Sequence, residues 1–479
     1  MVLSELLLQP SWPSHSYFQS NLDQIIQKME VFEIYDHRFF STVAITPENS
    51  PVSSIKFPVS SNDSGHDDDH NHVDMHNSLL DNKNTFDDVC RWLSDDDDND
   101  LQMEFMEFDS QTGIKNLLMA YAEAIRMEQE ELAKVIVKCI CEKANPNGLP
   151  LERIALNLFQ PEENQEKEYL FQESLKNFNP AFRVFYDIFP YVRFAHLTAG
   201  SAIIEAVPSH VDMVHIIDFD ICEGIQWPPV IEAIARIKKS MIITSIKLDH
   251  QDQDSQFDQT SWHLCNFARS LGLDLKVQEM GMTQMVKEMD HKRKSQSEFI
   301  AFNCMIGLLH MGRTTKTTQV MNFLTIAKGF LEKNEGIITL GDDLETERMI
   351  NYSDFSSFFI KNLEHYKALY ESMERGFPRY LNEARIAMES LFLAPFVSSK
   401  SWFQKWKERR ERVVFDMNLQ KGFGLKGERM SMKNLNEAMQ MVKEGETPYR
   451  IRIGENGNEM VLEWKGIPLV RVCAWKVNK

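Results

Sequence analysis

The sequence predicts an α/β protein with a doubly wound, mainly parallel sheet, and three observations support this prediction. Apolar runs of strand length alternate with helical runs from about residue 183 onward. Each helical run is long enough to cross over between two parallel strands. Helices on both faces would bury these strands completely, in agreement with their nearly continuous apolar composition.

Two helical stretches precede this alternation and predict a helical cap over about residues 111–175. The first covers residues 114–144, where "NPNG" ends the pattern, and the second covers residues 149–160. Apolar residues of the first stretch recur every seven positions, at Leu118, Ile125, Leu132 and Cys139. Because the apolar stripe is broad, a buried helix face or a dimer surface of the cap is favoured over a coiled coil.

The α/β core is expected over about residues 183–476. A helical stretch over residues 181–207, interrupted at Pro190, leads into it. Strands are predicted over residues 213–220, 241–248, 274–280, 298–308 and 336–343. Helices are predicted over residues 228–239, 261–273, 317–334 and 355–376. The chain ends in a predicted hairpin, because turn residues at 454–458 separate two alternating runs.

The first 110 residues are acidic and are expected to be largely disordered. They hold 22 Asp and Glu against 5 Lys and Arg, a net charge of −17 out of −19 for the chain. Residues 41–110 offer few large apolar side chains to offset the entropy of ordering. Acids and bulky apolar residues alternate over residues 86–108, a composition typical of activation segments, and a linker packed on the neighbouring domain is the alternative.

Other function classes have little support in the sequence. The residues after 110 carry 49 acids and 47 bases, so a strong electrostatic grip on nucleic acid is not expected. The seven cysteines are scattered and odd in number, which fits reduced thiols better than disulfides. No apolar run is long enough for a transmembrane helix. We expect no metal site and no catalytic residue, because ligand spacings and nucleophile–base signatures are missing.

One loop raises the question of a cofactor. The layout is Rossmann-like and resembles S-adenosylmethionine-dependent methyltransferases, in which the first strand leads into a D-x-G-x-G-x-G loop. Asp218 takes the acid position and Gly224 the last glycine, but Asp220 and Cys222 replace the other two glycines. Their Cβ atoms stand where a cofactor needs clearance. Asp249 stands where an acid would bind ribose hydroxyls. We therefore expect no cofactor, and a methyltransferase or ligand sensor is the alternative.

The segment "VHIID" at 214–218, continuing to "GIQWPP", resembles the signature of the GRAS family of plant transcriptional regulators. "LLMAYAEAI" is similar to the family's first leucine-rich region, and "WKGIPLVRVCAWKV" to its C-terminal tryptophan region. The resemblance covers residues from about 111 to 476, with Cys473 where the family has serine. "DFDICEGIQW" and "FNCMIGLLHM" resemble the nodulation signalling pathway 2 branch most.

The resemblance implies a nuclear transcriptional co-regulator that is not an enzyme. The implied partners are other GRAS proteins, especially of the nodulation signalling pathway 1 type, and DNA-binding transcription factors. Contact with promoter DNA would be mainly indirect, and a homodimer or heterodimer would be formed through the cap. The implied process is symbiotic signalling or strigolactone-related gene expression.

The family motif consists of Val214, His215, Ile216, Ile217 and Asp218. We expect Val214, Ile216 and Phe219 to be sheet core, His215 to be buried with its hydrogen bonds satisfied, and Asp218 to accept backbone N–H groups. Trp227 and Trp475 are expected to pack in the core. The candidates for a partner interface are Leu117, Leu118, Ile125 and Leu132. A buried face of a cap helix is the alternative for these four residues.

Direct DNA binding is a further alternative to action through partners. It would need a basic face. The sequence offers Lys292, Arg293, Lys294, Arg409, Arg410 and Arg412 for such a face.

Overall fold

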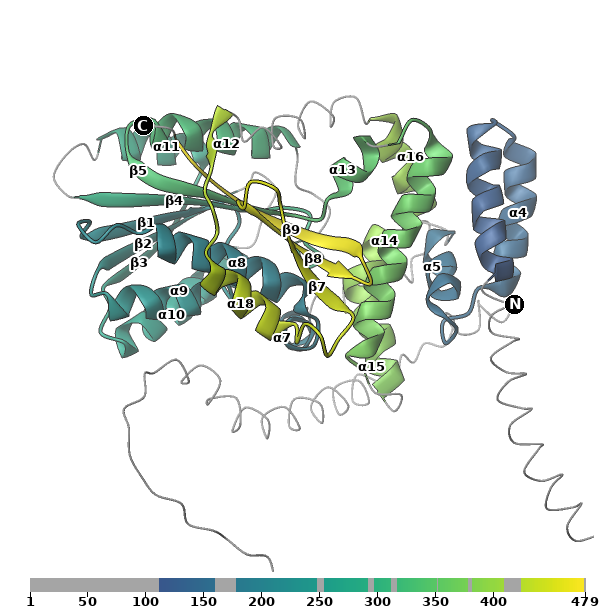
Figure 1. Cartoon of the computed structure of the whole chain (residues 1–479), viewed down its shortest axis with the longest axis horizontal. Coiled ribbons are helices and arrows are strands. Elements are labelled where there is room, and N and C mark those ends of the chain that lie inside the picture. Colours follow the sequence, from purple (N-terminus) through teal and green to yellow (C-terminus); the bar gives the residue numbers. More distant parts are fainter. Residues whose placement is uncertain are drawn as a thin grey trace, which may run out of the picture. The chain divides into compact units, whose positions relative to one another are not determined.

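The fold is built around one mixed sheet with helices on both faces (Figure 1). A computed structural model of the chain describes residues 112–159, 178–247, 254–291, 297–311, 317–350, 352–377, 381–408 and 424–477. Within these ranges nine strands form the sheet, in the order β3-β2-β1-β4-β5-β9-β8-β7, and the short β6 pairs with β9. The predicted doubly wound, methyltransferase-like α/β fold is confirmed. The acidic region 1–110 lies outside the described residues.

Five parallel strands make up one half of the sheet. They are β1 (Met213–Asp218), β2 (Ser240–Ile246), β3 (Leu275–Met280), β4 (Glu298–Met305) and β5 (Glu335–Asp342). Strand β1 lies between β2 and β4, so the chain reverses its direction of travel across the sheet at β1. The carboxyl ends of β1 and β4 therefore form the crevice in which doubly wound proteins bind their ligands.

The helices divide between the two faces of the sheet (Figure 1). One face carries α8 (Pro190–Ala206), α9 (Trp227–Arg236), α10 (Asp254–Ser270) and α18 (Met432–Met441). The other carries α11 (Met282–His291) and α12 (Thr317–Leu331), which pack on a continuous apolar cluster of β1, β4 and β5 side chains. Helix α7 (Phe178–Ile188) precedes α8 and ends before Pro190, as predicted. Pro228 lies in the first turn of α9, where its missing N–H costs nothing.

Three antiparallel strands close the sheet, where the sequence predicts a hairpin of two. They are β7 (Tyr449–Ile453), β8 (Glu459–Trp464) and β9 (Ile467–Lys476), and β6 covers Lys426–Gly427. The predicted turn over residues 454–458 joins β7 to β8. The second turn is at Lys465 and Gly466, which both have positive φ, 49° and 81°. Two such residues fit the tight turn that joins twisted antiparallel strands.

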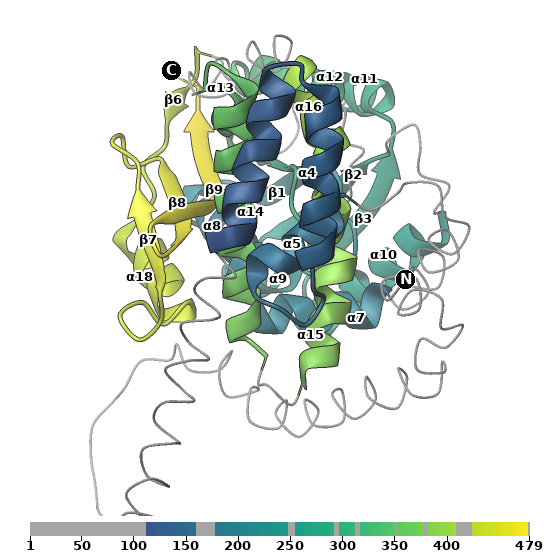
Figure 2. The same ribbon diagram turned by 90° about the vertical axis from the view of Figure 1, so that its right-hand side faces the viewer.

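The cap begins with two helices that lie side by side (Figure 2). The first covers residues 112–126 and the second is α4 (Glu130–Lys143), followed by α5 (Pro150–Leu158). The sequence predicts one continuous helix over 114–144, and this prediction is wrong. Residues 127–129 form a turn in which Glu128 has a φ of 57°, so the seven-residue repeat does not continue along one helix.

The cap helices pack against helices from much later in the chain (Figure 2). The main one is α14 (Phe355–Arg375), which α13 (Glu345–Ile350) and α16 (Ser399–Lys407) also contact. Between α14 and α16 lie α15 (Asn382–Met388) and short π- and 3₁₀-helices over Glu389–Leu393 and Ala394–Phe396. The ring of Tyr121 lies 5.6 Å from that of Phe359 on α14. Arg153 on α5 forms an ion pair with Glu374 at the end of α14. No helix in the described ranges is long and apolar enough to cross a membrane.

Candidate functional site

The five motif residues form the central strand β1, and all five are buried. Val214, Ile216 and Phe219 are buried in the core, as expected, and so is Ile217. His215 lies within hydrogen-bond distance of Glu298 (Nδ1 to Oε1, 3.0 Å) and Thr244 (Nε2 to Oγ1, 2.9 Å). The prediction of a buried histidine with satisfied hydrogen bonds is confirmed.

Asp218 is the last residue of β1. Its carboxylate accepts hydrogen bonds mainly from side chains. Trp227 Nε1 donates to Oδ2 at 2.9 Å, and Asn303 Nδ2 donates to Oδ1 at 2.9 Å. A backbone N–H of Asp220 also donates to this carboxylate, which is the expected type of contact. Burial raises the pKa of the Asp218 carboxyl to about 7, and the hydrogen bonds from Asn303 and Trp227 act in the opposite direction. Trp227 is buried, as expected, and so is Trp475.

The side-chain amides of Gln226 and Asn303 extend this hydrogen-bond network. Gln226 and Asn303 exchange hydrogen bonds through their side chains, with Nε2 to Oδ1 at 3.3 Å and Nδ2 to Oε1 at 3.1 Å. Thr339 Oγ1 donates to Asn303 Oδ1 at 2.9 Å. The network thus connects β1, α9, β4 and β5. Gln226 and Thr339 are absent from the sequence-based candidates. Gln226 lies within the "GIQWPP" segment, which could have indicated it, whereas Thr339 belongs to no recognisable pattern.

The loop over residues 219–226 is folded onto itself and onto α10. Asp220 Oδ1 accepts from the N–H of Cys222 at 3.1 Å, and Cys222 takes a positive φ of 45°. Thr260 Oγ1 on α10 donates to the carbonyl of Cys222 at 3.2 Å. Gly224 has a φ of 69°, and a Cβ at this position would lie 2.7 Å from Thr260 Cγ2. Gly224 is therefore required for close packing of the loop against α10.

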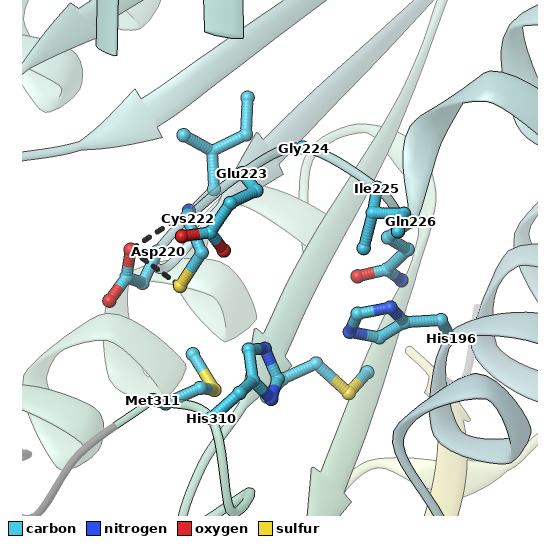
Figure 3. Close-up of a pocket in the computed structure, with 11 residues that line it drawn as sticks. His196, Asp220, Cys222, Glu223, Gly224, Ile225, Gln226, His310 and Met311 are labelled. Atoms are coloured by element: carbon cyan, nitrogen blue, oxygen red, sulfur yellow. Dashed lines mark hydrogen bonds between the residues drawn. The ribbon is translucent and has the colours of Figure 1, made fainter. Parts of the chain in front are cut away.

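A small hollow lies between this loop and the end of β4 (Figure 3). Loop residues 220–226 line it together with His196, Met305, His310 and Met311. The volume accessible to the centre of a water molecule is about 10 Å³, so the hollow has room for about one water. Both imidazoles point toward the loop (Figure 3).

The two histidines of the hollow are buried, and their imidazoles are uncharged near neutral pH. Their ring centroids are 5.6 Å apart, and each Nδ1 lacks a hydrogen-bond partner among the described residues. Burial lowers the pKa of His196 to about 3. Burial and then the neighbouring His196 lower the pKa of His310 well below its usual range. Within the described ranges no group of three or more His, Cys, Asp or Glu side chains is arranged to hold a metal ion.

The cap offers a second candidate site, and its four predicted interface residues differ in exposure. Leu118 is fully buried, while Leu117 and Ile125 are half-buried. Leu132 on α4 is 49% exposed. The turn at 127–129 separates Leu132 from the other three, so the four residues do not form one stripe along a single helix.

The exposed apolar residues of α4 form a stripe of their own. Leu132, Val135 and Cys139 are spaced by three and four residues, which places them on one side of the helix. Val135 is 61% exposed, and Met127 in the preceding turn is 54% exposed. We call Met127, Leu132, Val135 and Cys139 the α4 stripe. Val135 is missing from the sequence-based candidates, although its spacing from Leu132 could have indicated it.

Some predicted site residues fall outside the described ranges. They are Asp249, the proposed ribose ligand of the alternative function, and Lys292, Arg293, Lys294, Arg409, Arg410 and Arg412, the proposed basic face.

Comparison with known proteins identifies the family of this chain. Residues 114–476 match the model of the GRAS domain family. The chain belongs to the GRAS family. Members of this family are plant transcriptional regulators, including nodulation and DELLA types. The resemblance inferred from "VHIID" and the C-terminal tryptophan region is thereby confirmed.

Nodulation proteins are among the relatives of this GRAS chain. Protein NODULATION SIGNALING PATHWAY 2 of Medicago truncatula is 29% identical over 411 residues, covering 77% of each chain. The protein of the same name from Lotus japonicus is 28% identical over 390 residues, covering 75% of each. DELLA protein RGL3 of Arabidopsis thaliana is 25% identical, covering 77% of this chain and 70% of its own.

A solved structure supports the fold of this GRAS chain. The crystal structure of SCL7 from Oryza sativa matches 76% of this chain and 99% of that chain, with a TM-score of 0.56 and 22% sequence identity. At this identity the likeness concerns the fold.

Proposed function

We propose that this GRAS protein is a nuclear transcriptional co-regulator that acts through contacts with other regulators and catalyses no reaction. Its partners would be other GRAS proteins or DNA-binding transcription factors, in a homodimer or heterodimer. The observation that carries the proposal is the α4 stripe, in which four apolar side chains, three on α4 and one in the preceding turn, are exposed or half-buried.

The energetics of the stripe favour a helix or groove of a partner as its occupant. Exposed apolar side chains gain about 25 cal/mol per Å² when a partner covers them. Glu131, Lys134 and Lys138 flank the stripe on exposed positions, so a polar rim surrounds an apolar centre. Residues at i, i+3 and i+7 are the spacing at which one helix docks on another.

The relatives suggest a particular process. Two of them carry the name nodulation signaling pathway 2. We therefore propose a role in symbiotic signalling or strigolactone-related gene expression, with a nodulation signalling pathway 1 type protein as its partner. An acidic, aromatic-rich segment over residues 86–108 would contribute to activation.

A charge in the stripe tests this function. We expect Val135→Asp in the full-length chain to weaken binding of the nodulation signalling pathway 1 type protein by about tenfold or more, because the new carboxylate loses its water in the complex. Since Val135 is 61% exposed, thermal stability should not change. Isothermal titration of the purified partner gives the dissociation constant.

Ile237→Asp is the matched control, because Ile237 is 47% exposed at the end of α9 and lies outside the stripe. It should bind like the wild type. Equal binding by Val135→Asp and wild type would rule out the stripe as the interface. Tight binding of a bare promoter duplex that falls steeply with salt would instead support direct DNA recognition.

A further inference from the structure

We propose that the loop over residues 219–226 is a sealed plug that excludes S-adenosylmethionine from the switch point of the sheet. The methyltransferase-like sheet implies this cofactor at the carboxyl end of β1. The side chains present there do not fit it. The inference does not depend on the proposed partner function.

Space is the first obstacle. Pockets for ligands of cofactor size enclose about 300–1,000 Å³. The hollow beside the loop has room for about one water molecule. On the side away from the hollow the loop packs against α10, with which Gly224 is already in close contact. The loop therefore cannot move away from the hollow toward α10 without a clash.

The hydrogen-bonding groups of the site are the second obstacle, because they already bind one another. In a cofactor site, amides and carboxylates at this edge would be available to the ligand. Here Gln226 and Asn303 are paired, and both oxygens of Asp218 accept from protein donors. A cofactor would have to break these buried bonds, each of which is costly to leave unmade.

The third obstacle is the charge and size of the side chains at the two positions where a methyltransferase loop has glycine. Asp220 and Cys222 carry side chains where a methyltransferase loop has glycines, and both line the hollow. Glu223 lines it as well. Two carboxylates would repel the carboxylate of the methionine moiety. The two uncharged histidines on the opposite side supply no compensating positive charge.

The first test is calorimetric titration of S-adenosylmethionine into the full-length protein. We expect no saturable heat at millimolar cofactor. The double variant Asp220→Gly/Cys222→Gly, which restores the glycine pattern, should also give none, because the amide pair and Trp227 remain. Saturable binding by the wild type would overturn the proposal. Binding by the double variant alone would show that the two side chains exclude the cofactor and that the amide pair does not.

The second test asks whether the plug is sealed. The amide protons of Gly224 and Trp227 are bonded within the loop, to Ile221 and Gly224 oxygens. Hydrogen–deuterium exchange of the peptide 219–227 should therefore be slow in the wild type. Gln226→Ala should accelerate it by about tenfold or more, because Asn303 loses both hydrogen bonds to the loop. Gln259→Ala, an exposed glutamine on α10, is the matched control and should leave exchange unchanged. Fast exchange in the wild-type loop would contradict a sealed plug.

Discussion

Asp218 shows how the surroundings of one residue set its chemistry. The sequence predicts an acid at the end of the first strand, and it lies there. Its donors come from residues 9 and 85 positions further along the chain. Local sequence predicts the backbone contact, but the contacts to Trp227 and Asn303 exist only because β1, α9 and β4 meet at one edge.

The raised pKa of Asp218 predicts a pH-dependent stability. A carboxyl whose pKa is higher in the folded state stabilises the fold at low pH, and this contribution is lost as the pH rises through the folded value. The pKa of this carboxyl is about 7 in the folded state and 3.8 in the absence of the fold, so its contribution to the free energy of unfolding should fall between about pH 4 and pH 7.

Asp218→Asn should remove this part of the pH dependence, because the amide does not titrate. Denaturant unfolding of both proteins at several pH values measures the difference. The variant will be less stable at every pH, since one amide N–H₂ then faces a donor. Parallel stability curves for the two proteins across this range would show that the pKa of Asp218 is not raised.

Among the elements, the first two cap helices and the strands β8 and β9 show turns that the sequence pattern did not predict. No glycine or proline lies in the turn at Glu128. The helical spacing of apolar residues therefore continues across this turn in the sequence. Packing of α4 back on the first helix decides the turn, at the cost of a non-glycine residue with positive φ. Gly466 indicates a turn more clearly than any residue near Glu128 does, because it is a glycine within a run of strand residues. It forms a two-residue turn with Lys465.

Gly466→Ala should destabilise the protein by about 1 kcal/mol, because an L-residue with a φ near 81° is strained. No atom lies within 4 Å of a Cβ built at this position, so the cost is conformational. Gly281→Ala is the matched control. Its Cβ would also be in open space and its φ is not positive. Thermal melts of the two variants should therefore differ, and equal melting temperatures would contradict this account of the turn.

At the scale of the whole molecule, a buried ion cluster connects the cap to late helices. Arg153 on α5 is 3% exposed, and its guanidinium lies 3.1 Å from Glu389 Oε2 and 2.9 Å from Glu374 Oε2. Arg385 also pairs with Glu389, at 2.7 Å. Burial raises the pKa of Glu389, and both arginines lower it. The two contacts of Arg153 join residues that lie more than 200 positions apart.

Arg153→Met should cost about 3 kcal/mol, because it leaves the buried Glu389 with one arginine in place of two. Faster hydrogen–deuterium exchange over residues 112–158 would show that the loss is felt in the cap. Lys134→Met removes a surface ion pair with Glu131 on the same cap and should leave stability unchanged. If the two variants melted alike, the cluster would have no structural role.

Short-range periodicity and a few local motifs were enough to predict the fold class, the five parallel strands, the break at Pro190 and the family. They could not determine which leucines of the cap are exposed, the network of Gln226 and Thr339 around Asp218, or the packing of α5 on α14. Those features depend on contacts between distant segments. Only the folded chain brings such segments together, since burial and hydrogen bonding are satisfied jointly across the whole core.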